Sequence, residues 1–124
     1  MSQIKIKKGT FHHVESELAA YHETRKEIVR VKNELLNEKS PGCPGTMIMK
    51  HRQLEQMQMI VDAIEGVVFR LTPDKQELVK LRYWTNPQLL TWDGIAHRLF
   101  CNRTTAIRWR DEIVAAVAER IGWR

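Results

Sequence analysis

The chain has few cysteines and no long hydrophobic run. Cys43 and Cys101 lie far apart and form no C-x-x-C pattern, so the sequence supports neither a disulfide framework nor a cysteine metal site. No apolar run approaches the length of a membrane-spanning helix. The segment from Met1 to Thr10 is polar and rich in lysine, which does not resemble a signal peptide. We therefore expect a cytoplasmic protein with no membrane partner.

Catalytic motifs are missing as well. The 5 histidines are scattered, and His12 and His13 are adjacent, so on a helix they point in different directions. The chain shows no nucleophile elbow, no P-loop and no paired carboxylates. We expect no enzymatic activity, no metal site and no cofactor.

What the chain does have is enough apolar sequence for a packed core and an excess of positive charge. Its 124 residues are 43% hydrophobic, which suits one domain or one small domain with a helical extension. The formal net charge is +5. The window from Arg98 to Arg110 contains four arginines and no acidic residue. A solvated charged face would explain this window, but its position within the motif described below favours a polyanionic partner.

Two long amphipathic helices are expected in the first half of the chain. Thr10 is the expected N-cap of the first, which runs to about Asn37, and the second runs from about Met47 to Arg70. Between them, residues 38–46 are rich in proline and glycine and are expected to reverse the chain. The apolar residues of the first helix recur at spacings of three and four: Phe11, Val14, Leu18, Tyr21, Ile28 and Leu35. This seam is expected to pack either on the second helix or on another subunit.

The segment from Thr91 to Arg110 has the pattern of a helix-turn-helix. Thr91 is expected to cap its first helix and Asn102 its second, which begins at Arg103. Phe100 lies in the turn, where glycine is common because glycine adopts a positive φ without strain. Either the turn avoids that conformation, or Phe100 accepts strain because its ring packs well. A plain helical hairpin is the alternative, because it would share the same apolar spacing.

The second helix of the motif is expected to have one apolar and one DNA-binding face. Ala106, Trp109 and Ile113 share the apolar face. On the other face, arginine can contact guanine, threonine can contact phosphate or base, and an apolar side chain can contact a thymine methyl group. The residues expected to contact DNA are Arg98, Asn102, Arg103, Thr104, Ile107, Arg108 and Arg110.

From Leu71 onward the chain resembles region 4 of bacterial sigma-70 factors, in the stretches LTPDKQELVKLRYW and TWDGIAHRLFCNRTTAIRWRDEI. The first stretch is expected to be a helix that ends at about Trp84, with Thr72 as its N-cap. The whole chain resembles phage transcriptional regulators of the RinA/ArpU type, with the less specific N-terminal match VESELAAYHETRKEIVRVKNELL. The resemblance implies a sequence-specific DNA-binding regulator, an activator of phage late genes in a bacterial host cell. Gly94 and Phe100 depart from the family's pattern.

These observations predict an all-α protein with an N-terminal antiparallel helical hairpin, residues 1–70, and a C-terminal helix-turn-helix domain, residues 71–124. Double-stranded DNA is the expected partner, and the N-terminal helices could form a homodimer. Two other functions share these features. One is a small terminase-like DNA-packaging subunit, which would form a ring. The other is a protein-interaction module that contacts RNA polymerase through the methionine-rich second helix.

Overall fold

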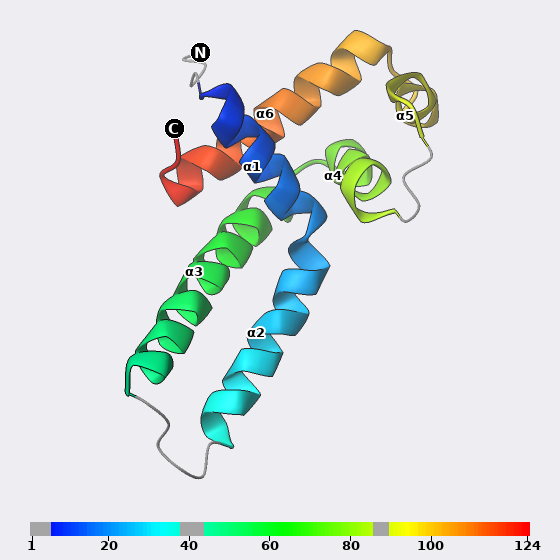
Figure 1. Ribbon diagram of the computed structural model, residues 1–124. Helices are drawn as coiled ribbons and strands as arrows, with labels where there is room; N and C mark the ends of the chain where they lie inside the picture. The colour runs from blue at the N-terminus through cyan, green and yellow to red at the C-terminus, as the bar shows by residue number, and fades with distance from the viewer. Residues whose placement is uncertain (1–5, 38–43, 86–89) are drawn as a thin grey trace.

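The protein is all-α, as the sequence predicts. The computed structural model describes residues 6–37, 44–85 and 90–124, and all regular elements in these ranges are helices (Figure 1). They are α1 (Lys8–Ala19), α2 (Tyr21–Leu36), α3 (Pro44–Val68), α4 (Pro73–Val79), the short π-helix η1 (Lys80–Trp84), α5 (Trp92–Arg98) and α6 (Arg103–Ile121). Cys43 lies outside the described residues. Within them, no helix is both long enough and apolar enough to cross a lipid bilayer.

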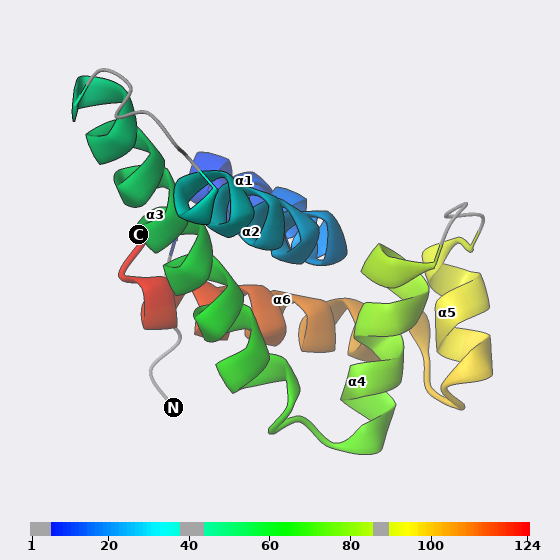
Figure 2. The ribbon, with the colours of Figure 1, turned by 90° about the horizontal axis from the view of Figure 1, so that it is seen from below.

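Helices α2 and α3 form the predicted antiparallel hairpin. They lie side by side in both views (Figures 1 and 2) and contact each other along their length. The apolar seam of α2 therefore packs within the chain, which is one of the two expected arrangements. The buried residues of the two helices are Tyr21, Ile28 and Val31 from α2 and Ile60, Val61, Ala63, Ile64 and Val68 from α3.

The first helix is not continuous, which corrects the prediction of one helix from Thr10 to Asn37. It breaks at Ala20 (φ −85°, ψ 1°), so that α1 packs on α6 while α2 packs on α3. Next to the break, the indole Nε1 of Trp84 donates a hydrogen bond to the carbonyl of Leu18 at 2.9 Å. A side chain that bonds to the helix backbone is a known cause of helix kinks.

The predicted N-cap of this helix is also wrong. Helix α1 begins at Lys8, with Lys7 as its N-cap residue and no capping side chain. The hydroxyl of Thr10 instead donates to the carbonyl of Arg124 at 2.8 Å. A contact with the far end of the chain has therefore replaced the local cap expected from sequence.

Helix α6 lies at the centre of the fold. It contacts α1, α3, α4 and α5, and Figure 2 shows α4 and α5 at one end of it. One hydrophobic cluster extends from Val14 and Leu18 in α1 through Leu78 and Val79 to Val114 and nearby residues of α6. The core is therefore continuous across the boundary expected between residues 70 and 71.

The helix predicted from Thr72 to Trp84 is regular only over its first part. Thr72 occupies the N-cap position, but its side chain makes no capping hydrogen bond, and Pro73 is the first helical residue. From Lys80 the chain continues as the π-helix η1, whose end is closed by a hydrogen bond from Thr85 Oγ1 to the carbonyl of Lys80 at 2.7 Å. This wider turn places Tyr83 and Trp84 against α1, where both make hydrogen bonds.

Candidate nucleic-acid interface

The two predicted caps of the helix-turn-helix are both present. Thr91 Oγ1 accepts a hydrogen bond from the backbone N–H of Gly94 at 3.1 Å, and Asn102 Oδ1 accepts from that of Thr105 at 2.8 Å. Each bond satisfies an N–H that the helix itself leaves unpaired and fixes the residue at which the helix begins. The starts of α5 and α6 are therefore set by local sequence.

A Schellman motif forms the turn between α5 and α6. The N–H of Cys101 donates to the carbonyl of Ala96 at 3.0 Å, and that of Phe100 donates to His97 at 3.2 Å. The motif requires a left-handed residue at position 100, and Phe100 adopts it, with φ of 56°. The turn therefore does not avoid the strained conformation. Phe100 is 97% exposed, so the expectation that packing of its ring compensates for the strain is wrong.

Interior residues of the motif pack as expected. Ile95, Ala96 and Leu99 are buried from the α5 side, and Ala106 is buried from the α6 side. The two alanines leave room for the helices to approach each other. Trp109 is partly buried against the same core. This packing fixes the orientation of α6 relative to α5, and hence which α6 residues face outward.

Five of the seven expected DNA-contacting residues are exposed near the turn: Arg98, Asn102, Arg103, Thr104 and Arg108. Ile107 is partly exposed. Arg108 Nε lies 4.0 Å from Glu112 Oε1, a weak pair between two exposed side chains that DNA could displace. Further along α6 the exposed charges are mostly negative, because Asp111, Glu112 and Glu119 follow. The positive surface of the motif therefore lies at the end of α5 and in the first two turns of α6.

Arg110 is placed differently from the other six. Its side chain is only 16% exposed, and its guanidinium lies 5.0 Å from the ring centres of both Phe11 and Trp92. It donates from Nη1 to Glu15 Oε2 at 3.3 Å and from Nε to Asp111 Oδ1 at 2.7 Å. Burial opposes its charge, but these carboxylates outweigh burial and raise the pKa of Arg110. This inward position does not fit the phosphate contact expected from sequence.

Glu15 joins Arg110 to η1. Its Oε2 also accepts a hydrogen bond from the hydroxyl of Tyr83 at 2.6 Å. Burial, together with this hydrogen bond, raises the pKa of the Tyr83 hydroxyl. The cluster of Glu15, Tyr83 and Arg110 connects α1, η1 and α6 just behind the exposed positive surface. Its role is to hold these elements together.

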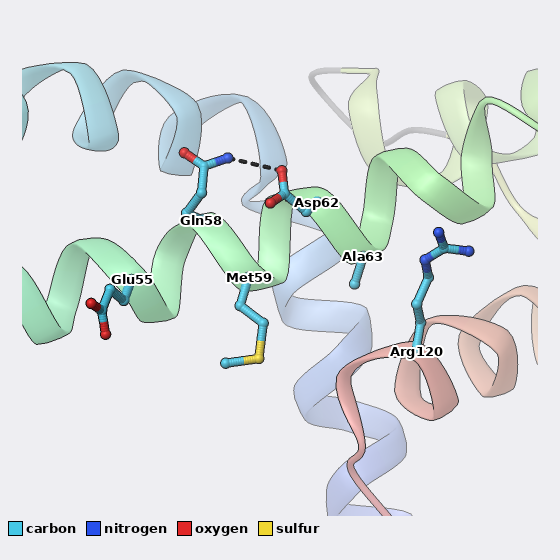
Figure 3. A pocket seen from close by; sticks show the side chains of 6 residues that line it. All are labelled: Glu55, Gln58, Met59, Asp62, Ala63 and Arg120. Atoms are coloured by element: carbon cyan, nitrogen blue, oxygen red, sulfur yellow. Dashed lines mark hydrogen bonds between the residues drawn. The ribbon is translucent and has the colours of Figure 1, made fainter.

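A second surface feature is a shallow groove between α3 and the C-terminal part of α6 (Figure 3). It is lined by Glu55, Gln58, Met59, Asp62, Ala63 and Arg120. Gln58 donates to Asp62 at 2.9 Å, and the guanidinium of Arg120 passes over Gly66, where a Cβ atom would lie 2.6 Å from Arg120 Cζ. The groove is open and lies toward the opposite end of α6 from the turn. Its lining offers no nucleophile with a neighbouring base, so we assign it no chemistry.

A model of the family described as "Protein of unknown function (DUF722)" matches residues 2–119. The chain belongs to this family. No curated protein and no solved structure matches it. The family assignment thus spans the hairpin and the helix-turn-helix together.

Sequence reasoning missed two features of this DUF722 chain. The ring of Phe100 is exposed beside the arginines, although the sequence singled out this residue only for its backbone. The cluster of Glu15, Tyr83 and Arg110 was missed entirely, because its members lie far apart in the chain and no local spacing connects them. An arginine in a basic window looks the same from sequence whether it faces solvent or a buried carboxylate.

Proposed function

We propose that this protein is a sequence-specific DNA-binding transcriptional regulator that inserts the N-terminal part of α6 into the major groove. The resemblance to phage regulators extends the proposal to activation of phage late genes. Arg103 and Arg108 would contact base edges, with Asn102, Thr104 and Ile107 beside them. Arg98 would hold a phosphate. Arg110 is left out of the contact set because its guanidinium is enclosed between α1 and α5.

The observation that best supports the proposal is the position of the positive surface on α6. Arg103, Thr104 and Arg108 are exposed in the first two turns, directly after the turn from α5, while the exposed charges beyond them are mostly negative. In helix-turn-helix proteins the N-terminal residues of the second helix contact base edges. Negative charge further along α6 would disfavour deeper contact with the DNA backbone. The positive charge and the position next to the turn therefore both favour the N-terminal end of α6 as the part that contacts DNA.

The experiment is selection of bound DNA from a random pool, followed by affinity measurements on the enriched and on random sequences. Arg108→Ala should weaken binding to the enriched sequence about 5- to 150-fold and binding to random DNA much less, since a base contact discriminates between sequences. Arg98→Ala should weaken binding to the enriched and to the random DNA about equally. It should also reduce the slope of log affinity against log salt concentration by about 1, as expected for the loss of one phosphate contact.

Arg52→Ala is the matched control. Arg52 is exposed on α3, so this variant loses the same charge away from the helix-turn-helix. It should bind both DNAs nearly as the wild type does. Failure to enrich any sequence, or an equal effect of Arg52→Ala and Arg108→Ala, would contradict the proposal.

Exposed apolar side chains on the hairpin favour a further contact, which we propose is a homodimer. Val29, Leu36, Ile48 and Met49 are all exposed, Leu36 by 81% and Met49 by 71%. A dimer would present two helix-turn-helix motifs to paired half-sites, and an enriched palindrome would accord with this. Mass measurement in solution distinguishes a dimer from the many-membered ring expected of a terminase-like packaging subunit. A monomer would leave these side chains for another partner, such as RNA polymerase.

A further inference from the structure

Phe100 is disfavoured in the isolated protein for two separate reasons. Its φ of 56° lies in the left-handed region, and among the described residues no other side-chain-bearing residue has a positive φ. The residue is also 97% exposed, the highest value among the exposed large hydrophobic residues of the described ranges. A left-handed conformation is costly for a residue with a Cβ atom, and an exposed aromatic ring gains nothing from the hydrophobic effect.

Folding of the turn does not explain the phenylalanine. The Schellman hydrogen bonds use only backbone groups, with the N–H groups of residues 100 and 101 as donors, and glycine at position 100 makes them without strain. At the other end of α6 the same motif does have glycine, Gly122, with φ of 94°. The apolar contacts of the turn come from Leu99, which is buried, and Cys101, which packs against the core. The ring of Phe100 therefore has no part in the turn or the core and is free to contact a partner.

Charge around Phe100 indicates what that partner is. Arg98 and Arg103, two and three residues away, are exposed, and neither makes an ion pair within the described part of the chain. The whole window from Arg98 to Arg110 has no acidic residue. A complementary partner has negative charge and apolar surface close together. DNA meets both requirements in the major groove, where phosphates flank the thymine methyl groups.

We propose that Phe100 is a DNA-contacting residue whose ring packs against a thymine methyl group at the edge of the major groove. This inference rests on the proposed function and adds a contact to it. The strained backbone aims the ring out of the turn, next to the start of α6, where a DNA-bound α6 would bring the ring to the groove. Phe100 would then contribute apolar recognition, and the neighbouring arginines the charge.

The test uses the full chain and its selected DNA. Phe100→Gly should bind that DNA about tenfold more weakly, since it loses the apolar area of the ring. The slope of log affinity against log salt concentration should not change, because no cation is lost. Phe69→Gly is the control, because Phe69 is also exposed but follows α3. The melting temperature of Phe100→Gly should equal or exceed that of the wild type, which excludes unfolding as the cause. Phe100→Asn, which also tolerates a positive φ, serves as a second variant.

Thymine-to-uracil replacement in the selected site identifies the contact on the DNA. Loss of the relevant methyl group should weaken wild-type binding about fourfold and leave Phe100→Gly unaffected. Equal binding by the wild type and Phe100→Gly would overturn the inference while leaving the proposed function intact. An equal uracil effect in both proteins would also overturn it. Absence of DNA binding by the wild type would instead refute the proposed function.

Discussion

Glu15→Ala removes the carboxylate that connects α1 to η1 and α6, and we expect it to destabilise the protein strongly. The Tyr83 hydroxyl donates to Glu15 Oε2 at 2.6 Å, and Tyr83 is only 7% exposed. In the variant this buried donor loses its acceptor, which costs about 1–3 kcal/mol. Arg110 loses one of two carboxylates but keeps Asp111 at 2.7 Å, so the second effect is smaller, less than about 1 kcal/mol. Together these give a loss of about 1–4 kcal/mol in the free energy of unfolding.

A double-mutant cycle with Tyr83→Phe isolates the hydrogen bond from the other effects. Once the hydroxyl is absent, Glu15→Ala no longer leaves a buried Tyr83 donor without its acceptor and affects only Arg110, so its cost should fall by about 1–2 kcal/mol. Urea unfolding followed by circular dichroism gives all four free energies. Glu23→Ala, at an exposed position on α2, is the control and should change stability by less than about 0.5 kcal/mol. A coupling energy below about 0.3 kcal/mol would refute the reasoning, because independent sites are additive within that range.

Two further predictions concern pH and the end of α6. Burial, reinforced by Glu15, raises the pKa of Tyr83 above the ordinary value of 10.0, so the folded protein holds this proton more tightly than the unfolded chain. That contribution to stability is complete below about pH 10 and is lost above it, by up to about 1.4 kcal/mol per pH unit, so Tyr83→Phe should flatten the alkaline decline in a pH series of urea unfolding. An equally steep decline in the variant would contradict the assignment. Gly122→Ala should lower stability by about 1 kcal/mol in thermal unfolding, because φ is 94° and no atom lies within 4 Å of the added Cβ, so backbone strain is its main effect. Unchanged stability would contradict this prediction, because it would mean that the turn relaxes to accommodate the added Cβ atom.

The features that sequence predicted correctly depend on a few neighbouring residues. Thr91 and Asn102 cap the helices that they precede, because a short polar side chain can reach the N–H three residues later. Pro73 is the first residue of its helix, since the N–H that it lacks has no partner there in any case. The apolar face of α3 is likewise set by its own spacing. The helix-turn-helix is visible in sequence because each of its signals is local.

The features that sequence did not predict depend on contacts between distant residues. The spacing of α1 and α2 is continuous, and the break at Ala20 coincides with a hydrogen bond from Trp84 to Leu18. The hydroxyl of Thr10 bonds to Arg124 and does not cap α1. At both places the local sequence still has the pattern on which the prediction was based, so local spacing could not reveal the difference. Sequence therefore predicted an exposed position for Arg110 that the structure does not show, since it could not distinguish the enclosed Arg110 from the exposed Arg108.

Helix α6 belongs to two parts of the molecule at once, and this has a consequence for the interface. Its first two turns present Arg103 and Arg108, while Ile113, Val114 and Val117 further along the same helix are buried in the shared core. Helices α1 and α3 both contact α6, so together they fix the orientation of the helix whose N-terminal end forms the positive surface. Because α6 is one continuous helix, packing that fixes its buried part also fixes the direction of its exposed part. Under the proposed function, the N-terminal helices would affect DNA binding through the orientation of α6, without touching DNA themselves.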